Sequence, residues 1–582
     1  MKRLIYILIS FTFFFGSCED DIFDRAPLDS ISDADVWEDP TLLRAYLTDI
    51  YSRLPVNGFN WAGLDTNTDI ATTNKGNQTA LTTGSMSRTN EPNVISYWNY
   101  NIIRDLNVFL ENIVDAPIGE PVKAQLEGEA RTLRAMIYFE MQKRYGGVPL
   151  VDVVLDPFNE IDVQYKRRST EEAIADFIDA DLNTAIGLLS EDPEPRGQIN
   201  KWTAYALKAR ANLWSASIAK YGNVQLDGLV GIPPNRADEF FTKASAAADA
   251  VIASGNYSLY NQHEDKAENY RRLFLDEGND EAIFKIIYDG VNIAHSWDLY
   301  NAPISFSGGR GSWDNPLLEF ILGFENIDGS TDQPALGPDH LYNDGFAPFQ
   351  NKDPRLKAMV FFQGDTWTDE QVVQSYEGID TSPTPDPSTI MSVWETSYEG
   401  IPTIGFDSRL NPFDDKSTRS GFMVKKFIME ETFVPGNQSS TDYMVFRLAE
   451  MYLTKAEAEF ELGNDLEAAA NALNATRERA GISLVDASTI TLDHVRTERR
   501  SELAWEQHRW WDLRRWRIAD EILNDHVFQG LRTILHFETG QFYFLPVDAE
   551  PFSRIFRPEH YYNPITDNRI NNNTELVENP LY

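Results

Sequence analysis

Apolar residues recur every three or four positions over long stretches of the chain, which is the pattern of amphipathic helices. Between residues 97 and 114, for example, the side chains at this spacing are Ile102, Leu106, Phe109, Leu110 and Ile113. The same pattern predicts helices over 126–145, 169–189, 202–221, 236–254, 446–463, 466–480 and 496–517. Short loops containing Gly, Asn or Pro separate several of them, so antiparallel helix pairs are expected.

The predicted hairpin over 446–480 has a further regularity. Tyr452, Ala456, Phe460 and Ala468 alternate large with small side chains at a spacing close to that of a tetratricopeptide unit, which lets two helices approach closely. A generic helical hairpin remains the alternative. The pattern favours a mainly α fold.

The chain changes character between about residues 260 and 440. Gly, Pro, Asn and Asp interleave there with aromatic residues and short apolar runs. Segments 305–313 and 381–390 contain too much Gly or Pro for regular structure. We therefore expect a loop-rich insertion between two helical parts.

The first residues have the organisation of an export signal. Lys2 and Arg3 precede an apolar run over 4–15 that is too short to cross a bilayer, and Gly16 and Ser17 then lead to Cys18. The letters FGSC resemble a bacterial lipobox, so lipidation at Cys18 is expected; an ordinary secretory signal with a free thiol is the alternative. The acidic run at 19–21 resembles a surface-display signal of Bacteroidetes lipoproteins, or is a solvated linker.

Charge and cysteine content exclude several classes of function. The chain has 51 Lys and Arg against 90 Asp and Glu, a net charge of −39. Such an acidic chain is unsuited to binding nucleic acid or anionic lipid through a general basic surface. Cys18 is the single cysteine, so neither an internal disulfide nor a cysteine-based metal site can form.

Several blocks along the chain resemble the SusD/RagB family of surface nutrient-binding lipoproteins. They read RTLRAMIYFEMQKRYGGVPL (131–150), KDPRL (352–356), FRLAEMYLTKAEAE (446–459), RRSELAWEQHRWWDLRRW (499–516) and ENPLY (578–582). They follow one another in the family's order from end to end. The arginines in these blocks, such as Arg134 and Arg509, are interleaved with carboxylates and are interpreted as clamps between helices rather than ligand contacts.

The resemblance implies a tetratricopeptide-like helical-hairpin superhelix scaffold with an inserted, loop-rich, irregular ligand-binding subdomain. The expected division is a signal peptide over 1–17, a lipidated tether over 18–40, helical scaffold over 41–260, binding subdomain over 261–440 and a C-terminal helical part over 441–582. It also implies display on the outer membrane, non-catalytic capture of oligosaccharides or polysaccharides, and a SusC-like TonB-dependent transporter as partner. Capture of peptides or glycoprotein fragments is the alternative within the family.

No catalytic or cofactor motif is recognisable. The chain has no G-x-S-x-G, H-E-x-x-H, Walker or G-x-G-x-x-G pattern, so a surface hydrolase is disfavoured and no cofactor is expected. Asp65, Asn67 and Asp69 form only a fragment of a calcium loop; a structural calcium ion there is conceivable but not expected. A pure interaction scaffold is a further alternative.

Aromatic residues in loop-like sequence are the candidate ligand site. The axial C–H face of a sugar packs on a Trp or Tyr ring, while polar side chains at the rim bind the hydroxyls. The candidate residues are Trp61, Trp297, Tyr300, Arg310, Trp313 and Trp394. Each ring can instead belong to the core beneath a loop. Trp98 and Trp367 are interpreted as structural because regular apolar runs flank them.

Overall fold

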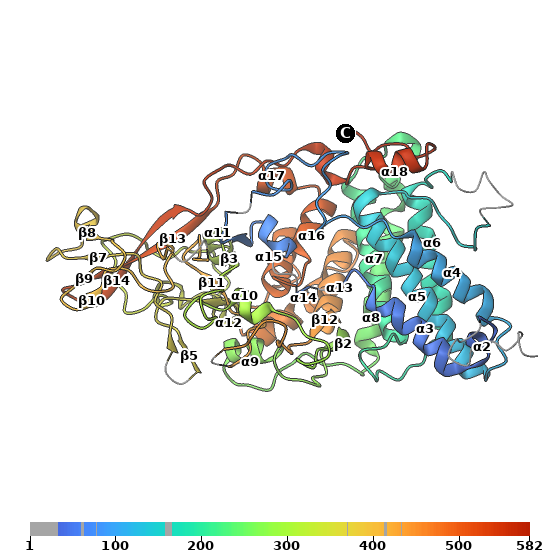
Figure 1. Ribbon diagram of the computed structural model, residues 1–582, viewed down its shortest axis with the longest axis horizontal. Helices are drawn as coiled ribbons and strands as arrows, with labels where there is room; N and C mark the ends of the chain where they lie inside the picture. Colours follow the sequence, from blue (N-terminus) through green and yellow to red (C-terminus); the bar gives the residue numbers. More distant parts are fainter. Residues whose placement is uncertain are drawn as a thin grey trace, which may run out of the picture.

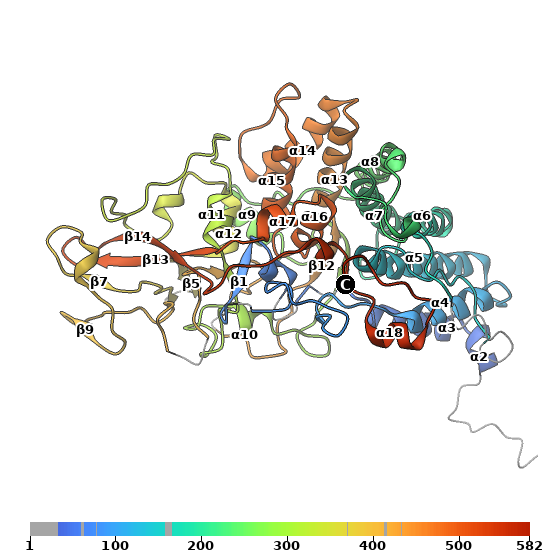
Figure 2. The same ribbon diagram turned by 90° about the horizontal axis from the view of Figure 1, so that it is seen from above.

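The computed structural model describes residues 33–56, 58–59, 63–76, 78–156, 166–368, 371–412, 416–431 and 433–582. The molecule is elongated, with helices gathered at one end and short strands and loops at the other (Figure 1). Helices from the C-terminal part of the chain lie between these two ends in both views (Figures 1 and 2).

Five of the N-terminal helices form where the apolar spacing predicts them, whereas the two that precede residue 53 were not predicted. They are α2 (Asp33–Glu38), α3 (Pro40–Ser52), α4 (Tyr100–Ile113), α5 (Glu120–Tyr145), α6 (Glu171–Leu188), α7 (Lys201–Tyr221) and α8 (Ala237–Ala253). The Thr170 hydroxyl caps α6, and Asn200 with Thr203 forms a capping box at α7. The apolar faces of α5 and α6, and of α7 and α8, pack together as antiparallel pairs.

The C-terminal helices continue the same packing. They are α13 (Leu448–Leu462), α14 (Leu466–Ala480), α15 (Leu492–Leu503), α16 (Arg509–Arg515), α17 (Ala519–Leu523) and α18 (Asp567–Asn572). Helix α13 packs on both α8 and α14, so the hairpin at 446–480 joins the stack of the N-terminal part. Ala456, which is fully buried, allows this close approach. The expected mainly α scaffold of helical hairpins is confirmed.

One predicted helix is wrong. The chain over 496–517 breaks between α15 and α16, where Trp505 and Gln507 adopt φ of +61° and +64°. Tertiary contacts outweigh the helical pattern here: the Trp505 ring packs edge-on against Phe320 at 5.1 Å, and Gln507 Oε1 accepts a hydrogen bond of 2.8 Å from the Leu64 amide.

A buried ionic network joins the helical scaffold to the loop-rich part. Its members are Glu281, Arg355, Arg447, Arg479, Glu498, Glu502 and Glu506, all at most 6 % exposed. Glu502 ion-pairs with Arg355 at 2.7 Å, with Arg447 at 2.6 Å and with Arg479. Removing one member of such a network leaves a buried charge uncompensated, so these arginines act as structural clamps.

The region between the helical parts holds short elements and many loops. Its helices are α9 (Lys266–Arg272), α10 (Trp297–Asn301), α11 (Leu318–Leu322) and α12 (Pro354–Met359). Its strands are β2 (Ala282–Ile286), β3 (Asp314–Pro316), β4 (Val360–Phe361), β5 (Thr366–Trp367), β6 (Gln371–Val372), β7 (Ile379–Asp380), β8 (Ile390–Met391), β9 (Ser397–Tyr398), β10 (Ile401–Pro402), β11 (Met423–Val424) and β12 (Tyr443–Arg447). Strand β3 pairs antiparallel with β1 (Ala71–Thr73), far earlier in the chain.

A long hairpin from the C-terminal part also enters this region. Strands β13 (Gln529–His536) and β14 (Gln541–Asp548) pair along eight residues each and join β7 and β8 in a four-stranded sheet. The hairpin, red in Figure 1, runs among the yellow segments at the narrow end of the molecule. The hairpin was not among the elements predicted from the sequence, although alternating apolar residues and a Thr539-Gly540 turn mark it.

Candidate functional site

Two of the predicted aromatic residues form a pair at one surface. The rings of Tyr300 and Trp313 meet edge to face, with centroids 5.7 Å apart and planes at 78°. Tyr300 lies on α10 and Trp313 at the end of the following loop, where the Trp313 amide donates to the Tyr300 carbonyl at 2.9 Å and the Ser312 amide to the Ala302 carbonyl at 3.0 Å. The glycine-rich loop therefore folds back over α10, as its composition permits.

An N-terminal segment braces this pair from the other side. The Asn74 amide donates to the Trp313 carbonyl at 3.1 Å as an extension of the β1–β3 ladder. The exposed Lys75 places its Nζ 5.5 Å from the Trp313 ring centroid, within cation–π range. Sequence reasoning missed Lys75, although the turn signal Thr-Asn-Lys-Gly at 73–76 marks a loop.

The accessibility of the pair suits ligand contact. Tyr300 and Trp313 are half-buried and Arg310 is exposed. Trp313 Nε1 donates to the Arg310 carbonyl at 3.2 Å, which fixes the ring orientation. Together Lys75, Tyr300, Arg310 and Trp313, which we call the Tyr300–Trp313 surface, offer aromatic faces with cationic hydrogen-bond donors beside them.

Two buried carboxyl groups lie beneath this surface. Asp314, next to Trp313, is fully buried, and neither of its carboxyl oxygens accepts a hydrogen bond in the described part of the chain. Burial, with the nearby charge of Asp65, raises the pKa of Asp314 well above its usual range. Burial likewise raises the pKa of Asp65 to about 7.

Trp297 does not belong to this surface. Its side chain is 1 % exposed, its Nε1 donates to the Lys426 carbonyl at 3.0 Å, and its ring packs near Phe59 and Phe427. The expectation of a ligand-facing ring at Trp297 is wrong, because α10 turns this side chain into the core and Tyr300 outward.

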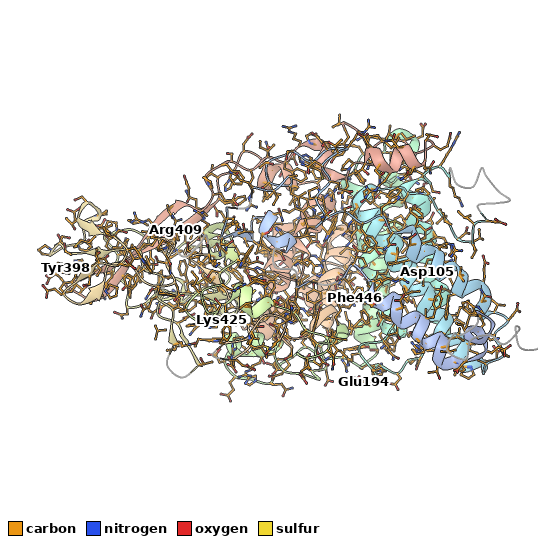
Figure 3. The ribbon with its side chains drawn as sticks, in the orientation of Figure 1. Asp105, Glu194, Tyr398, Arg409, Lys425 and Phe446 are labelled. Atoms are coloured by element: carbon orange, nitrogen blue, oxygen red, sulfur yellow. The ribbon has the colours of Figure 1, made fainter. Side chains whose placement is uncertain are left out.

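Trp394 lies elsewhere, near the narrow end of the molecule. Its half-buried ring packs at 6.3 Å from Phe406, close in sequence to the β9–β10 hairpin. Figure 3 labels Tyr398 of this hairpin at the tip, well away from α10 as labelled in Figure 1. Trp394 is therefore not brought together with Tyr300 and Trp313. The predicted residues Cys18 and Trp61 lie outside the described residues.

The structure also bears on the predictions made for Trp98, Trp367 and the fragment of a calcium loop. Trp367 is 5 % exposed, in agreement with a structural role, whereas Trp98 is half-buried and lines a cleft described below. The carboxylate of Asp69 accepts hydrogen bonds from Arg509 and Arg500, so it is not free to ligate calcium. Within the described ranges, no group of three or more His, Cys, Asp or Glu side chains is placed to hold a metal ion.

Comparison with known proteins assigns the family. A family model described as the SusD family matches residues 280–582, just over half of the chain. The chain belongs to the SusD family. A second model, described as starch-binding and associating with the outer membrane, matches residues 29–213 and supports association of this SusD-family chain with that membrane. Across the described residues, no helix combines the length and hydropathy needed to span a membrane.

Individual SusD-like proteins match over nearly the whole length. A SusD-like protein of Bacteroides ovatus is 23 % identical, covering 97 % of this chain and 92 % of the relative. The crystal structure of a SusD-like protein from Bacteroides fragilis superposes with a TM-score of 0.70 at 25 % identity, covering 96 % and 100 %. A second B. fragilis structure, described as a SusD-like carbohydrate-binding protein, gives a TM-score of 0.68 at 22 % identity, covering 93 % and 99 %.

Proposed function

We propose that this chain is a non-catalytic surface lipoprotein that captures oligosaccharides and delivers them to a SusC-like TonB-dependent transporter. The observation that carries the proposal is the Tyr300–Trp313 surface. Two half-buried rings held at 78° to one another present faces for the C–H side of a sugar, and Lys75 and Arg310 supply donors for its hydroxyl groups.

Membership in the SusD family supports the same reading, since one structural relative is described as carbohydrate-binding. Outer-membrane association fits a protein anchored by a lipid at Cys18 and seated on a transporter in the same membrane. Transport of the captured glycan through the SusC-like partner completes the proposed role.

The first experiment compares glycan binding of the wild type with that of Trp313→Ala and Tyr300→Ala. Affinity electrophoresis on a panel of polysaccharides identifies the ligand, and calorimetry with its oligosaccharides then gives affinities. Loss of a central aromatic contact costs about 2 kcal/mol or more, so each variant should bind about thirtyfold more weakly.

Trp202→Ala is the matched control. Trp202 is also half-buried, with its ring stacked on Tyr205 at 6.0 Å, but it lies at the start of α7 in the helical part of the molecule. This variant should bind like the wild type. Normal binding by both Trp313→Ala and Tyr300→Ala would contradict the assignment of the site, and binding of peptides but of no glycan would contradict the proposed ligand.

A second experiment tests the partner. The full-length lipoprotein, affinity-tagged at its C-terminus, should co-purify from detergent-solubilised outer membranes with a TonB-dependent transporter in near-stoichiometric amount. Recovery of the lipoprotein without any transporter, under conditions that retain its lipid anchor, would contradict delivery through such a partner.

A further inference from the structure

A second polar cleft lies between the C-terminal helix α18 and the N-terminal helices. Helix α18 returns to the helical end of the molecule in both views (Figures 1 and 2). The cleft there has a volume of about 550 Å³, within the range of ligand pockets in proteins. Its lining includes Trp98, Tyr100, Lys166, Asn568, Arg569 and Asn572.

The aromatic wall of this cleft is held in place by its neighbours. The Trp98 ring lies 5.4 Å from Tyr100 and meets Tyr145 edge to face at 5.1 Å. The Tyr100 hydroxyl donates to the Pro149 carbonyl at 2.7 Å, so its ring is fixed as well. The rings are therefore preorganised, which lowers the entropy that a ligand must lose on binding.

The cationic wall is equally well fixed. The Arg569 guanidinium lies 5.1 Å from the Trp98 ring centroid and ion-pairs with the buried Glu91 at 2.7 Å, while its Nη2 also donates to Ser96 Oγ at 3.1 Å. The exposed side chains of Asn568 and Asn572 on α18 add amide donors and acceptors beside it.

The charge of the lining departs from that of the whole protein. The chain has a net charge of −39, yet the described residues that line this cleft include Lys166 and Arg569 and no Asp or Glu. Glu91 balances Arg569, and Lys166 makes no ion pair with any described residue, so the lining that the structure describes carries net positive charge.

We propose that this cleft binds an oligosaccharide bearing an acidic group, a carboxylate or a sulfate ester. Trp98 receives the apolar face of a sugar ring, the amides of Asn568 and Asn572 bind hydroxyl groups, and Lys166 pairs with the acidic group. Helix α18, which lines this cleft, lies apart from α10, which carries Tyr300, in both views (Figures 1 and 2). The cleft is therefore a second site and does not depend on the first.

The test titrates the protein with oligogalacturonates and with their methyl esters, which keep the sugar backbone but lose the charge. Sulfated galactan oligosaccharides and their desulfated forms are the second arm. All titrations are done in the Trp313→Ala background, so that the first site does not obscure the result. Binding of at least one acidic series, with its neutral counterpart about tenfold weaker or more, is the expected result.

Variants then place that binding in the cleft. Lys166→Glu should weaken binding by about tenfold or more, and the double variant Asn568→Ala/Asn572→Ala should also weaken it, without a change in fold because these side chains are exposed. Lys266→Glu, on α9, makes the same change in net charge at a half-buried lysine outside the cleft and should bind normally.

Three results would overturn the proposal. The first is no binding of either acidic series at millimolar concentration. The second is equal binding of the neutral counterparts. The third is a Kd unchanged in both Lys166→Glu and Asn568→Ala/Asn572→Ala. Because the titrations already lack Trp313, none of these results bears on whether the Tyr300–Trp313 surface binds glycan.

Discussion

Arg509 holds Asp69 in a two-point ion pair although the two residues are 440 positions apart in the sequence. Arg509 Nε donates to Asp69 Oδ1 at 2.7 Å and Nη2 donates to Oδ2 at 2.8 Å, with both side chains buried. Arg500 adds a third bond of 3.1 Å to the same carboxylate. These contacts connect the segment before β1 to helices α15 and α16. They thereby also help to position Lys75, which follows β1 and belongs to the Tyr300–Trp313 surface.

Arg509→Ala should therefore destabilise the protein without removing a ligand contact. It leaves the buried Asp69 with only one arginine partner, and breaking a buried ion pair typically costs about 3–5 kcal/mol. Thermal unfolding should show a Tm well below that of the wild type, while calorimetry below that Tm should show nearly unchanged glycan affinity.

Arg167→Ala is the matched control, because Arg167 also pairs with a carboxylate, Glu575 at 2.7 Å, but its side chain is 81 % exposed. Exposed pairs contribute about 0–1 kcal/mol. Equal Tm values for Arg509→Ala and Arg167→Ala would show that Arg509 is not a structural clamp.

Trp297→Ala should act on stability, in contrast to Trp313→Ala. Removing the indole of a side chain that is 1 % exposed leaves a cavity in the core, a change that typically costs about 3–5 kcal/mol. Trp313→Ala should lower Tm far less, since its ring is half-buried, and should lower glycan affinity instead. Scanning fluorimetry and calorimetry on both variants separate the two effects; a wild-type Tm for Trp297→Ala would contradict its place in the core.

The contrast between these tryptophans shows what the sequence could predict. Helices such as α14, whose bounds agree with the prediction at both ends, follow from local periodicity and capping, which neighbouring residues determine. The direction in which a loop-flanked ring points depends on partners such as Lys426, more than a hundred positions away. Local pattern cannot reveal such a partner. Tyr300, Trp313 and Trp297 could therefore be proposed as candidates together, but the sequence could not show which of them faces a ligand and which lies in the core.

The same physical reason explains the break between α15 and α16. Residues 504–508 have helical composition, and the pattern over 496–517 is continuous. The bonds that favour the break come from Leu64, Phe320 and Arg447, all distant in sequence. Long-range contacts outweighed local propensity here, as they commonly do in buried segments.

Lipidation at Cys18 gives a prediction outside the described residues. Cys18→Ala removes the single thiol that can carry a diacylglycerol group, so the variant should lack incorporated palmitate and appear in the soluble fraction after cell lysis. Ser17→Ala, which keeps a small residue before the cysteine, is the control and should remain in the outer membrane. Carbonate-resistant membrane association of Cys18→Ala would contradict the lipid anchor.

The buried carboxyl groups beneath the binding surface predict an unusual pH dependence of stability. A carboxyl whose pKa is raised on folding holds a proton in the folded protein at pH values where the unfolded chain has released it. For Asp65 this window runs from about pH 4, the ordinary range, to the folded pKa of about 7, and Asp314 is shifted in the same direction. The free energy of unfolding should therefore decrease as pH rises through this window.

Asp314→Asn removes one ionisable group and the repulsion between the two carboxylates. Above pH 7 the variant should be more stable than the wild type by about 1 kcal/mol or more, a Tm increase on the order of 2 °C, and near pH 4 the difference should vanish. Asp69→Asn is the matched control in the same segment: its two arginine partners hold the pKa of Asp69 below its usual range, so its stabilising effect exists at neutral pH and is lost on acidification. Asp69→Asn should accordingly lower Tm at pH 7 and above. Melting curves recorded from pH 4 to 9 test the protonation of Asp314. If the Tm difference between Asp314→Asn and the wild type stays constant over this range, Asp314 does not titrate as its burial requires.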